Sequence, residues 1–201
     1  MSAGCVIIRC IVCISVFVTG IGMLGQQARA RPVADDDEKS AEWQGTFDWS
    51  AEQRVPAGMQ YFSGHLDLTL DEDEDGVLKG TLMGSQSEKL DLSNCPSVAV
   101  SPGSLGARLT GKFTRQQVTI SVADPTSTPP QMSPCPGSGP PGTPPAVFKW
   151  PHFDEALHGL KPVNEYQYEF DREWTMPQMY PYTVRYTVKM QRTETMRRAA
   201  D

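Results

Sequence analysis

The sequence has little positive charge. Its 18 lysines and arginines are outnumbered by 24 aspartates and glutamates, and apart from Arg197 and Arg198 they are scattered along the chain. A nucleic-acid-binding protein needs clustered basic side chains that displace counterions from phosphates, and binding to an anionic lipid surface needs a similar polybasic patch. The composition therefore argues against nucleic acid and anionic membranes, and leaves a protein or a small ligand as the expected partner.

The sequence also lacks the motifs that mark several large classes of enzyme. It contains no G-x-S-x-G nucleophile elbow, no phosphate-binding P-loop and no H-E-x-x-H zinc motif. Catalytic triads can be assembled from distant positions, so a secreted hydrolase stays open as an alternative. The sequence favours a protein that is not an enzyme.

The N-terminus resembles a cleavable export signal. Arg9 is the only charge before an apolar run, Cys10–Gly25, which ends in Ala28-Arg29-Ala30. A short positive stretch, an apolar segment and small residues at −1 and −3 predict a signal peptide over residues 1–30. An uncleaved anchor is the alternative, because residues 10–28 approach the ~20 apolar residues that span a bilayer. We expect a secreted or periplasmic protein with no stable membrane insertion after cleavage.

Cysteine is scarce once this signal is removed. Three of the five cysteines lie within it, and only Cys95 and Cys135 remain. Two cysteines in an oxidising compartment predict one disulfide bond, which would stabilise the fold by roughly 4 kcal/mol in the chain-entropy account. Free thiols or half of a metal site are the alternatives, but the pair lacks C-x-x-C spacing. Cleavage also removes two arginines and shifts the net charge from −6 to −8.

Beyond the signal, apolar side chains recur at alternate positions. Within each of several runs, residues of one parity are apolar: Trp43, Phe47 and Trp49; Phe62, Leu66, Leu68 and Leu70; Leu78 and Leu82; Leu109 and Phe113; Val118, Ile120 and Val122; Tyr166, Tyr168 and Phe170; Tyr182, Val184, Tyr186, Val188 and Met190. This period predicts strands with one buried face, and a sheet covered on one face only must be antiparallel. Polar turns within residues 71–76 and 114–117 predict hairpins.

These runs predict one all-β domain over residues 43–191. We expect a single antiparallel β-barrel or β-sandwich of about eight or nine short strands. Closure would remove the edge strands, which favours the barrel slightly.

The remaining segments carry weaker patterns. Residues 31–42 predict a disordered acidic leader, and residues 192–201 a flexible tail. Residues 124–145 hold nine prolines and predict a long Pro-rich surface loop without strands or helices; a polyproline ligand is the alternative reading. Residues 146–150 are a strand candidate, and residues 153–160 predict one or two helical turns.

The run DEDEDG is the most distinctive acidic motif. Asp71, Asp73 and Asp75 match the first half of a calcium loop, which makes them a candidate weak Ca²⁺ site. The acid required at the twelfth position is replaced by Leu82. A solvated turn that keeps the sheet edge soluble is the simpler interpretation.

Histidines offer a second candidate site. His152, Asp154 and His158 lie close together in the sequence, as metal ligands or an acid–base pair would. The two histidines are six residues apart, which differs from the spacing of three or four that places ligands on one helical face. His65 falls on the polar face of its strand. We expect no cofactor besides the candidate calcium ion.

Three classes of function remain. The first is an exported β-domain that binds a ligand or partner protein, with inhibitors of foreign hydrolases as one example by fold analogy. The second is a structural, envelope-associated protein, and the third is a secreted hydrolase. A cavity of ligand size would favour the first class. A solid core would favour the second. The third would be favoured if His152 and Asp154 converged with a carboxylate in a cleft. The aromatic residues either line a ligand site or form the core.

Overall fold

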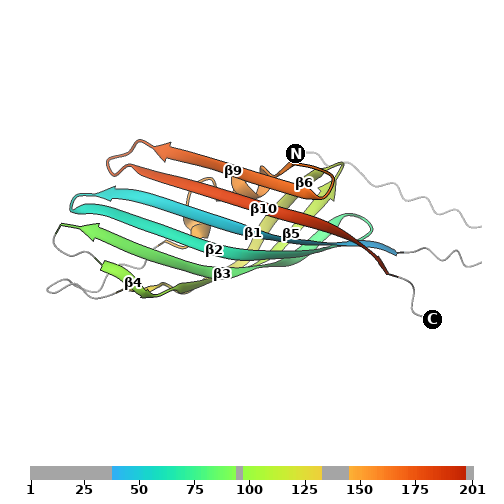
Figure 1. Cartoon of the computed structure of the whole chain (residues 1–201), viewed down its shortest axis with the longest axis horizontal. Coiled ribbons are helices and arrows are strands. Elements are labelled where there is room, and N and C mark those ends of the chain that lie inside the picture. Colours follow the sequence, from blue (N-terminus) through green and yellow to red (C-terminus); the bar gives the residue numbers. More distant parts are fainter. Residues whose placement is uncertain (1–37, 94–96, 133–144, 198–201) are drawn as a thin grey trace, which may run out of the picture. The chain divides into compact units, whose positions relative to one another are not determined.

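The computed structural model describes residues 38–93, 97–132 and 145–197 (Figure 1). The expected signal over residues 1–30 lies outside these ranges, as do both cysteines of the expected disulfide, Cys95 and Cys135. None of the described helices is long and apolar enough to cross a membrane.

The described residues form an antiparallel sheet with one short helix and one 3₁₀ turn. Eight strands follow each other in the order β6-β5-β3-β2-β1-β10-β9-β8, while β4 pairs with β3 and β7. Their bounds are β1 Glu38–Val55, β2 Gly58–Glu72, β3 Val77–Leu92, β4 Ser97–Ser101, β5 Gly103–Thr114, β6 Gln117–Ser127, β7 Gln131–Met132, β8 Lys161–Pro162, β9 Gln167–Met176 and β10 Tyr182–Arg197. The 3₁₀ turn η1 spans Val147–Lys149 and the helix α1 spans Phe153–His158.

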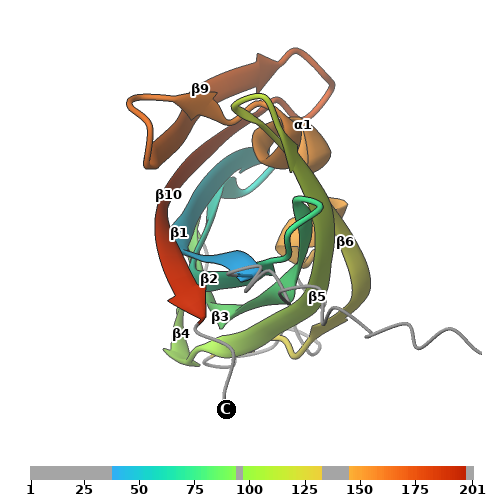
Figure 2. The same ribbon diagram turned by 90° about the vertical axis from the view of Figure 1, so that its right-hand side faces the viewer.

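The sheet curls on itself, as Figure 2 shows, and α1 contacts β6, β9 and β10. This open half-barrel confirms the expected all-β, barrel-like fold. Four strands are much longer than expected, with 15 to 18 residues each. Their length follows from an alternation that continues through positions where glycine or a polar residue replaces the apolar one.

The core lies on the concave face. Alternate residues of each strand point inward, and fully buried members include Trp43, Phe47, Leu66, Leu68, Leu82, Tyr186 and Val188. Gly64 and Gly84 occupy inward positions where a Cβ would overlap other atoms: the Trp49 indole nitrogen at Gly64 and the backbone carbonyl oxygen of His65 at Gly84. These two glycines therefore let large side chains and neighbouring strands approach closely.

Two expectations at the ends of the pattern were wrong. β1 already begins at Glu38, within the expected disordered leader, and β10 continues to Arg197 through the expected tail. These two ends pair with each other, from Glu38 opposite Arg197 to Trp43 opposite Arg192. Mutual pairing gives each segment backbone partners that its composition alone does not reveal.

The Pro-rich segment is also more ordered at its edges than expected. β6 runs to Ser127 and β7 covers Gln131–Met132, so strand structure enters residues 124–145; residues 133–144 lie outside the described part. The strand expected over residues 146–150 is instead the 3₁₀ turn η1. The short helical segment expected after residue 152 is confirmed as α1.

Candidate functional site

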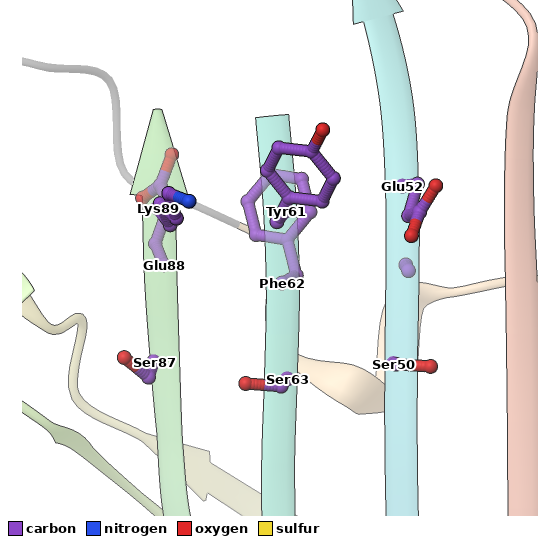
Figure 3. Close-up of a pocket in the computed structure, with 9 residues that line it drawn as sticks. Ser50, Glu52, Tyr61, Phe62, Ser63, Ser87, Glu88 and Lys89 are labelled. Carbon is purple, nitrogen blue, oxygen red and sulfur yellow. The ribbon is translucent and has the colours of Figure 1, made fainter. Parts of the chain in front are cut away.

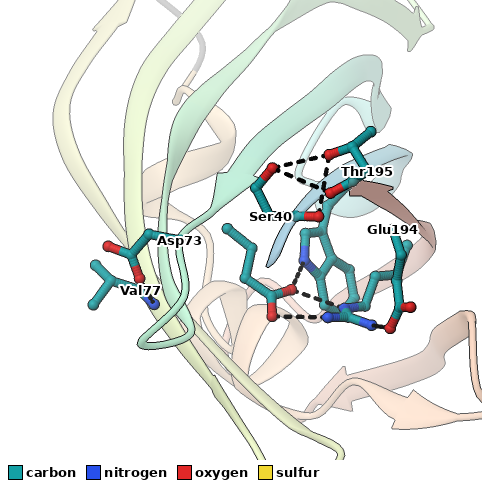
Figure 4. A network of polar contacts seen from close by, with 8 residues as sticks. Ser40, Asp73, Val77, Glu194 and Thr195 are labelled. Atoms are coloured by element: carbon teal, nitrogen blue, oxygen red, sulfur yellow. Dashed lines mark hydrogen bonds and ion pairs between the residues drawn. The ribbon is translucent and has the colours of Figure 1, made fainter. Parts of the chain in front are cut away.

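A buried ion pair lies at one end of the concave face, where it lines a pocket of about 450 Å³. Arg192 donates from Nε to Glu72 Oε2 at 2.8 Å and from Nη2 to Oε1 at 3.0 Å. The indole nitrogen of Trp43 donates to the same Oε2 at 2.7 Å, and the guanidinium lies 4.9 Å from the ring centroid of Phe113. We call these four residues the Arg192 end; Figure 4 shows its hydrogen bonds together with those of Ser40, Glu194 and Thr195.

The electrostatics of this end are balanced. Hydrogen bonding to Glu72 raises the pKa of Arg192 above its already high value, although burial opposes the charge. Both Glu72 oxygens accept hydrogen bonds, and the third guanidinium nitrogen, Nη1, donates to Glu194 at 2.6 Å. A buried carboxylate paired in this way does not need a further partner.

The other end of the concave face holds similar residues in a different arrangement. Inward positions of β1, β2 and β3 place Trp49, Gly64 and Gln86 in one row, and Ala51, Phe62 and Glu88 in the next. Trp150, which follows η1, packs over both rows, with its ring centroid 6.1 Å from Trp49 and 5.2 Å from Phe62. We call Trp49, Phe62, Gln86, Glu88 and Trp150 the Glu88 end.

Three polar atoms at the Glu88 end are buried and have no hydrogen-bond partner among the described residues. They are the indole nitrogens of Trp49 and Trp150 and the Oε2 atom of Glu88. Only 5% of Glu88 is exposed, and leaving such a group unpaired costs about 1 to 3 kcal/mol. Gln86 is better satisfied, because its amide donates to the carbonyl of Thr128 at 3.1 Å.

The two ends differ in whether the buried glutamate has a cation beside it. Each combines a buried glutamate, a tryptophan and further aromatic rings, but only the Arg192 end contains a cation among its described inward side chains. Val184 and Tyr182 occupy the positions of β10 opposite Ala51 and Gln53. Buried polar groups without partners are uncommon in native proteins, and functional sites are one of the places where they persist.

Glu88 should make stability depend on pH. Burial raises its pKa from the usual 4.5, so protonation favours the folded state. The stabilising effect is complete below pH 4.5 and is lost as pH rises through the raised pKa. The neighbouring inward residues Phe62, Gln86 and Leu90 are uncharged, while Lys89 is exposed on the outer face.

Glu88→Gln tests this dependence. Wild type and variant should have similar free energies of unfolding below pH 4.5, and the variant should become the more stable one as pH rises. Urea unfolding from pH 4 to 8 measures the difference. Glu52→Gln, which changes an exposed carboxylate on β1, should show no such divergence, and parallel curves for Glu88→Gln and wild type would contradict the assignment.

A shallow pocket of about 350 Å³ lies on the outer face of the same strands. Ser50, Ser63 and Ser87 form a row across β1, β2 and β3, and Tyr61 lies in the next row beside Glu52 and Lys89 (Figure 3). Apart from Glu88, whose side chain points inward, none of its described lining residues carries a buried unpaired polar atom. The Glu88 end is therefore the stronger candidate site.

The residues of the candidate calcium site do not converge. Asp71 lies on the outer face of β2 opposite Lys79, whereas Asp73 closes the β2–β3 turn. The Oδ1 atom of Asp73 accepts from the backbone nitrogens of Asp75 at 3.1 Å and Val77 at 2.8 Å. Within the described ranges, no three His, Cys, Asp or Glu side chains are grouped so that they could hold a metal. The calcium site stays a prediction.

Asp73→Ala should lower the free energy of unfolding by about 1 kcal/mol, because it removes two hydrogen bonds that close the turn. Asp75→Ala is the matched control, and should cost about 0.5 kcal/mol or less. Chemical denaturation of both variants measures the difference. Equal losses would show that the turn is not stabilised by the Asp73 side chain.

The candidate histidine cluster is only partly assembled. His152 precedes α1 in a left-handed conformation (φ 62°), and its Nδ1 lies 3.0 Å from Glu155 Oε2. Its ring stacks on Trp174 with a centroid distance of 4.5 Å. Asp154 and His158 are exposed. The structure therefore pairs His152 with Glu155 rather than with the two residues the sequence suggested.

This pairing has a structural explanation. Arg172 on β9 donates to the other oxygen of Glu155 at 2.8 Å and lies 5.0 Å from the ring of Trp174. Glu155 thus connects α1 to β9, and the stack with His152 adds a second contact. His65 lies exposed on the outer face, as expected, with its Nδ1 2.6 Å from Asp48; this hydrogen bond raises its pKa.

Sequence reasoning missed both ends of the concave face. Glu72 and Glu88 continue the inward parity of Leu70 and Leu82, so the alternation predicts that both glutamates are buried. The place of Trp150 was not readable, because it depends on how η1 folds back over the sheet.

Comparisons with known proteins returned no match from protein-family models, curated proteins or solved structures. The function must therefore be argued from the site itself.

Proposed function

We propose that this chain is an exported, non-catalytic binding protein that recognises a ligand or partner protein at its Glu88 end. The observation that carries the proposal is the set of three buried, unpaired polar atoms on Trp49, Glu88 and Trp150. A ligand that supplies partners for these atoms would recover the free energy that their burial costs.

The packing supports binding at an end of the concave face rather than in its middle. Phe47, Leu66, Leu68 and Leu82 are completely buried between the two ends, so this part is filled by side chains. Among the described residues, Tyr168 Oη and His152 Nε2 are also buried and unpaired, but three of the five such atoms lie together at the Glu88 end. Apolar replacements at this end would be more stable. Sites that lower stability in this way are typical of function.

Export and a disulfide belong to the same proposal. We infer cleavage after Ala30 and a Cys95–Cys135 bond, both from the sequence. The mass of the protein isolated from its producer, before and after reduction, tests both: the chain should begin at Arg31 and carry no free thiol. A chain that begins at Met1 would contradict the export proposal.

Native mass spectrometry of the mature chain, after incubation with an extract of its producer, tests the binding proposal. Wild type and Glu52→Gln should carry the same additional bound mass, and Glu88→Gln should lose it. Glu88→Gln should remain folded, because the neutral amide relieves a buried charge. A bound mass that Glu88→Gln retains, or no bound mass on wild type, would contradict the proposal.

A further inference from the structure

We propose that the Glu88 end binds a guanidinium group, which would take the place that Arg192 takes at the opposite end. This inference rests on the proposed binding function and adds the chemical class of the ligand. It follows from comparing two sites within one chain, one complete and one lacking its cation.

The complete site shows what a guanidinium does in these surroundings. Arg192 forms two hydrogen bonds with Glu72 and lies over the ring of Phe113, while Trp43 donates to the same carboxylate. A planar guanidinium fits a carboxylate through two parallel hydrogen bonds and stacks on aromatic rings. At this end a glutamate, an indole donor and a neighbouring ring surround the guanidinium, and Glu194 accepts a hydrogen bond from its remaining nitrogen.

The Glu88 end offers the same set of partners. Glu88 supplies the carboxylate, with Oε2 unpaired, and Phe62 lies directly opposite it on β2. Trp150 packs 5.2 Å from Phe62 and 5.8 Å from Tyr182, centroid to centroid, so aromatic rings cluster around Phe62, the residue paired with Glu88. Cations bind such faces by the cation–π interaction.

The chain does not supply this cation from its described residues. Lys89, next to Glu88, is exposed on the outer face and lies 5.6 Å from the ring of Tyr61. The positions of β10 that correspond to Arg192 at this end hold Val184 and Tyr182. An ammonium group has three N–H donors but no planar pair that matches both oxygens of a carboxylate, so the bidentate geometry seen at Glu72 favours guanidinium.

Tryptophan indole signals of the mature chain provide the test. The sequence holds four tryptophans, and ¹⁵N-labelled indoles can be assigned with single Trp→Phe variants. Titration with arginine amide should shift the Trp49 and Trp150 signals and leave Trp43 unchanged, since its nitrogen is already bonded to Glu72. Citrulline amide, in which a neutral ureido group replaces the guanidinium, should bind at least about tenfold more weakly.

Two variants complete the design. Glu88→Gln should weaken arginine amide by about tenfold or more, and Glu52→Gln should leave it unchanged. Agmatine and an acetylated Gly-Arg-Gly amide peptide distinguish a small guanidinium compound from an arginine of a partner protein: whichever binds more tightly identifies the source.

Equal binding of citrulline amide, or full binding by Glu88→Gln, would overturn the guanidinium inference. The proposed function is tested separately. If a bound mass depends on Glu88 but arginine amide has no effect, the binding function stands and the guanidinium inference is wrong.

Discussion

Arg192→Met should lower the free energy of unfolding by about 3 to 5 kcal/mol, the usual cost of removing one partner from a buried ion pair. Only 15% of the Arg192 side chain and 8% of the Glu72 side chain are exposed. Without the guanidinium, the Glu72 carboxylate would keep Trp43 as a partner but remain buried and charged. Urea denaturation at neutral pH measures the loss.

A second, exposed pair provides the control. Arg185 forms two hydrogen bonds with Asp171, yet both side chains are about half exposed. Water and salt screen such a pair, so Arg185→Met should cost about 1 kcal/mol or less. Adding Glu72→Gln to Arg192→Met should recover much of the loss, because the amide is neutral and still accepts from Trp43. An Arg192→Met variant as stable as Arg185→Met would show that the buried pair does not hold this end together.

Gly84→Ala should cost about 3 kcal/mol, at the upper end of the range for overpacked cores. A Cβ at this inward position on β3 would overlap the backbone carbonyl oxygen of His65, and backbone cannot move aside as a flexible side chain can. Strands β2 and β3 would have to separate where Leu66 and Gly84 pair. Thermal and chemical unfolding of the variant measure the effect.

Gly106→Ala on β5 is the matched control. A Cβ there would have Thr126 Oγ1 as its nearest atom, at 3.1 Å, and the next atom is 3.9 Å away. Stability should change by about 1 kcal/mol or less in either direction, since the loss of backbone freedom in the unfolded chain offsets a small contact. Equal losses at the two glycines would contradict the close packing of β2 on β3.

The alternating pattern predicted the sheet and much of its core because burial of one face imposes a period of two. Trp43, Phe47, Val184 and Val188 are all inward and buried, as their parity indicated. Residues Glu38 to Glu42 were predicted to be disordered because the segment is acidic. They form a strand because they pair with the C-terminal part of β10. Composition describes a segment by itself, and strand pairing depends on a partner far along the chain.

The candidate site was harder to predict than the fold. Glu88 shares the parity of Leu82 and Leu90, but the sequence does not tell whether a buried acid finds a partner. Glu72 is paired by Arg192, which lies 120 positions away in the sequence. The sequence around Glu88 does not indicate whether a comparable cation pairs with it. Trp150 reaches the site through an irregular segment, for which no periodic signal exists.

The central claim is that the Glu88 end lowers stability in order to bind a cation. Unfolding of wild type and Glu88→Gln in the same buffer at neutral pH, with and without arginine amide, tests it most directly. Without arginine amide, Glu88→Gln should be more stable than wild type by about 1 to 3 kcal/mol. With arginine amide present, only the wild type should gain stability. A less stable Glu88→Gln, together with equal responses of both proteins to the amide, would contradict the account.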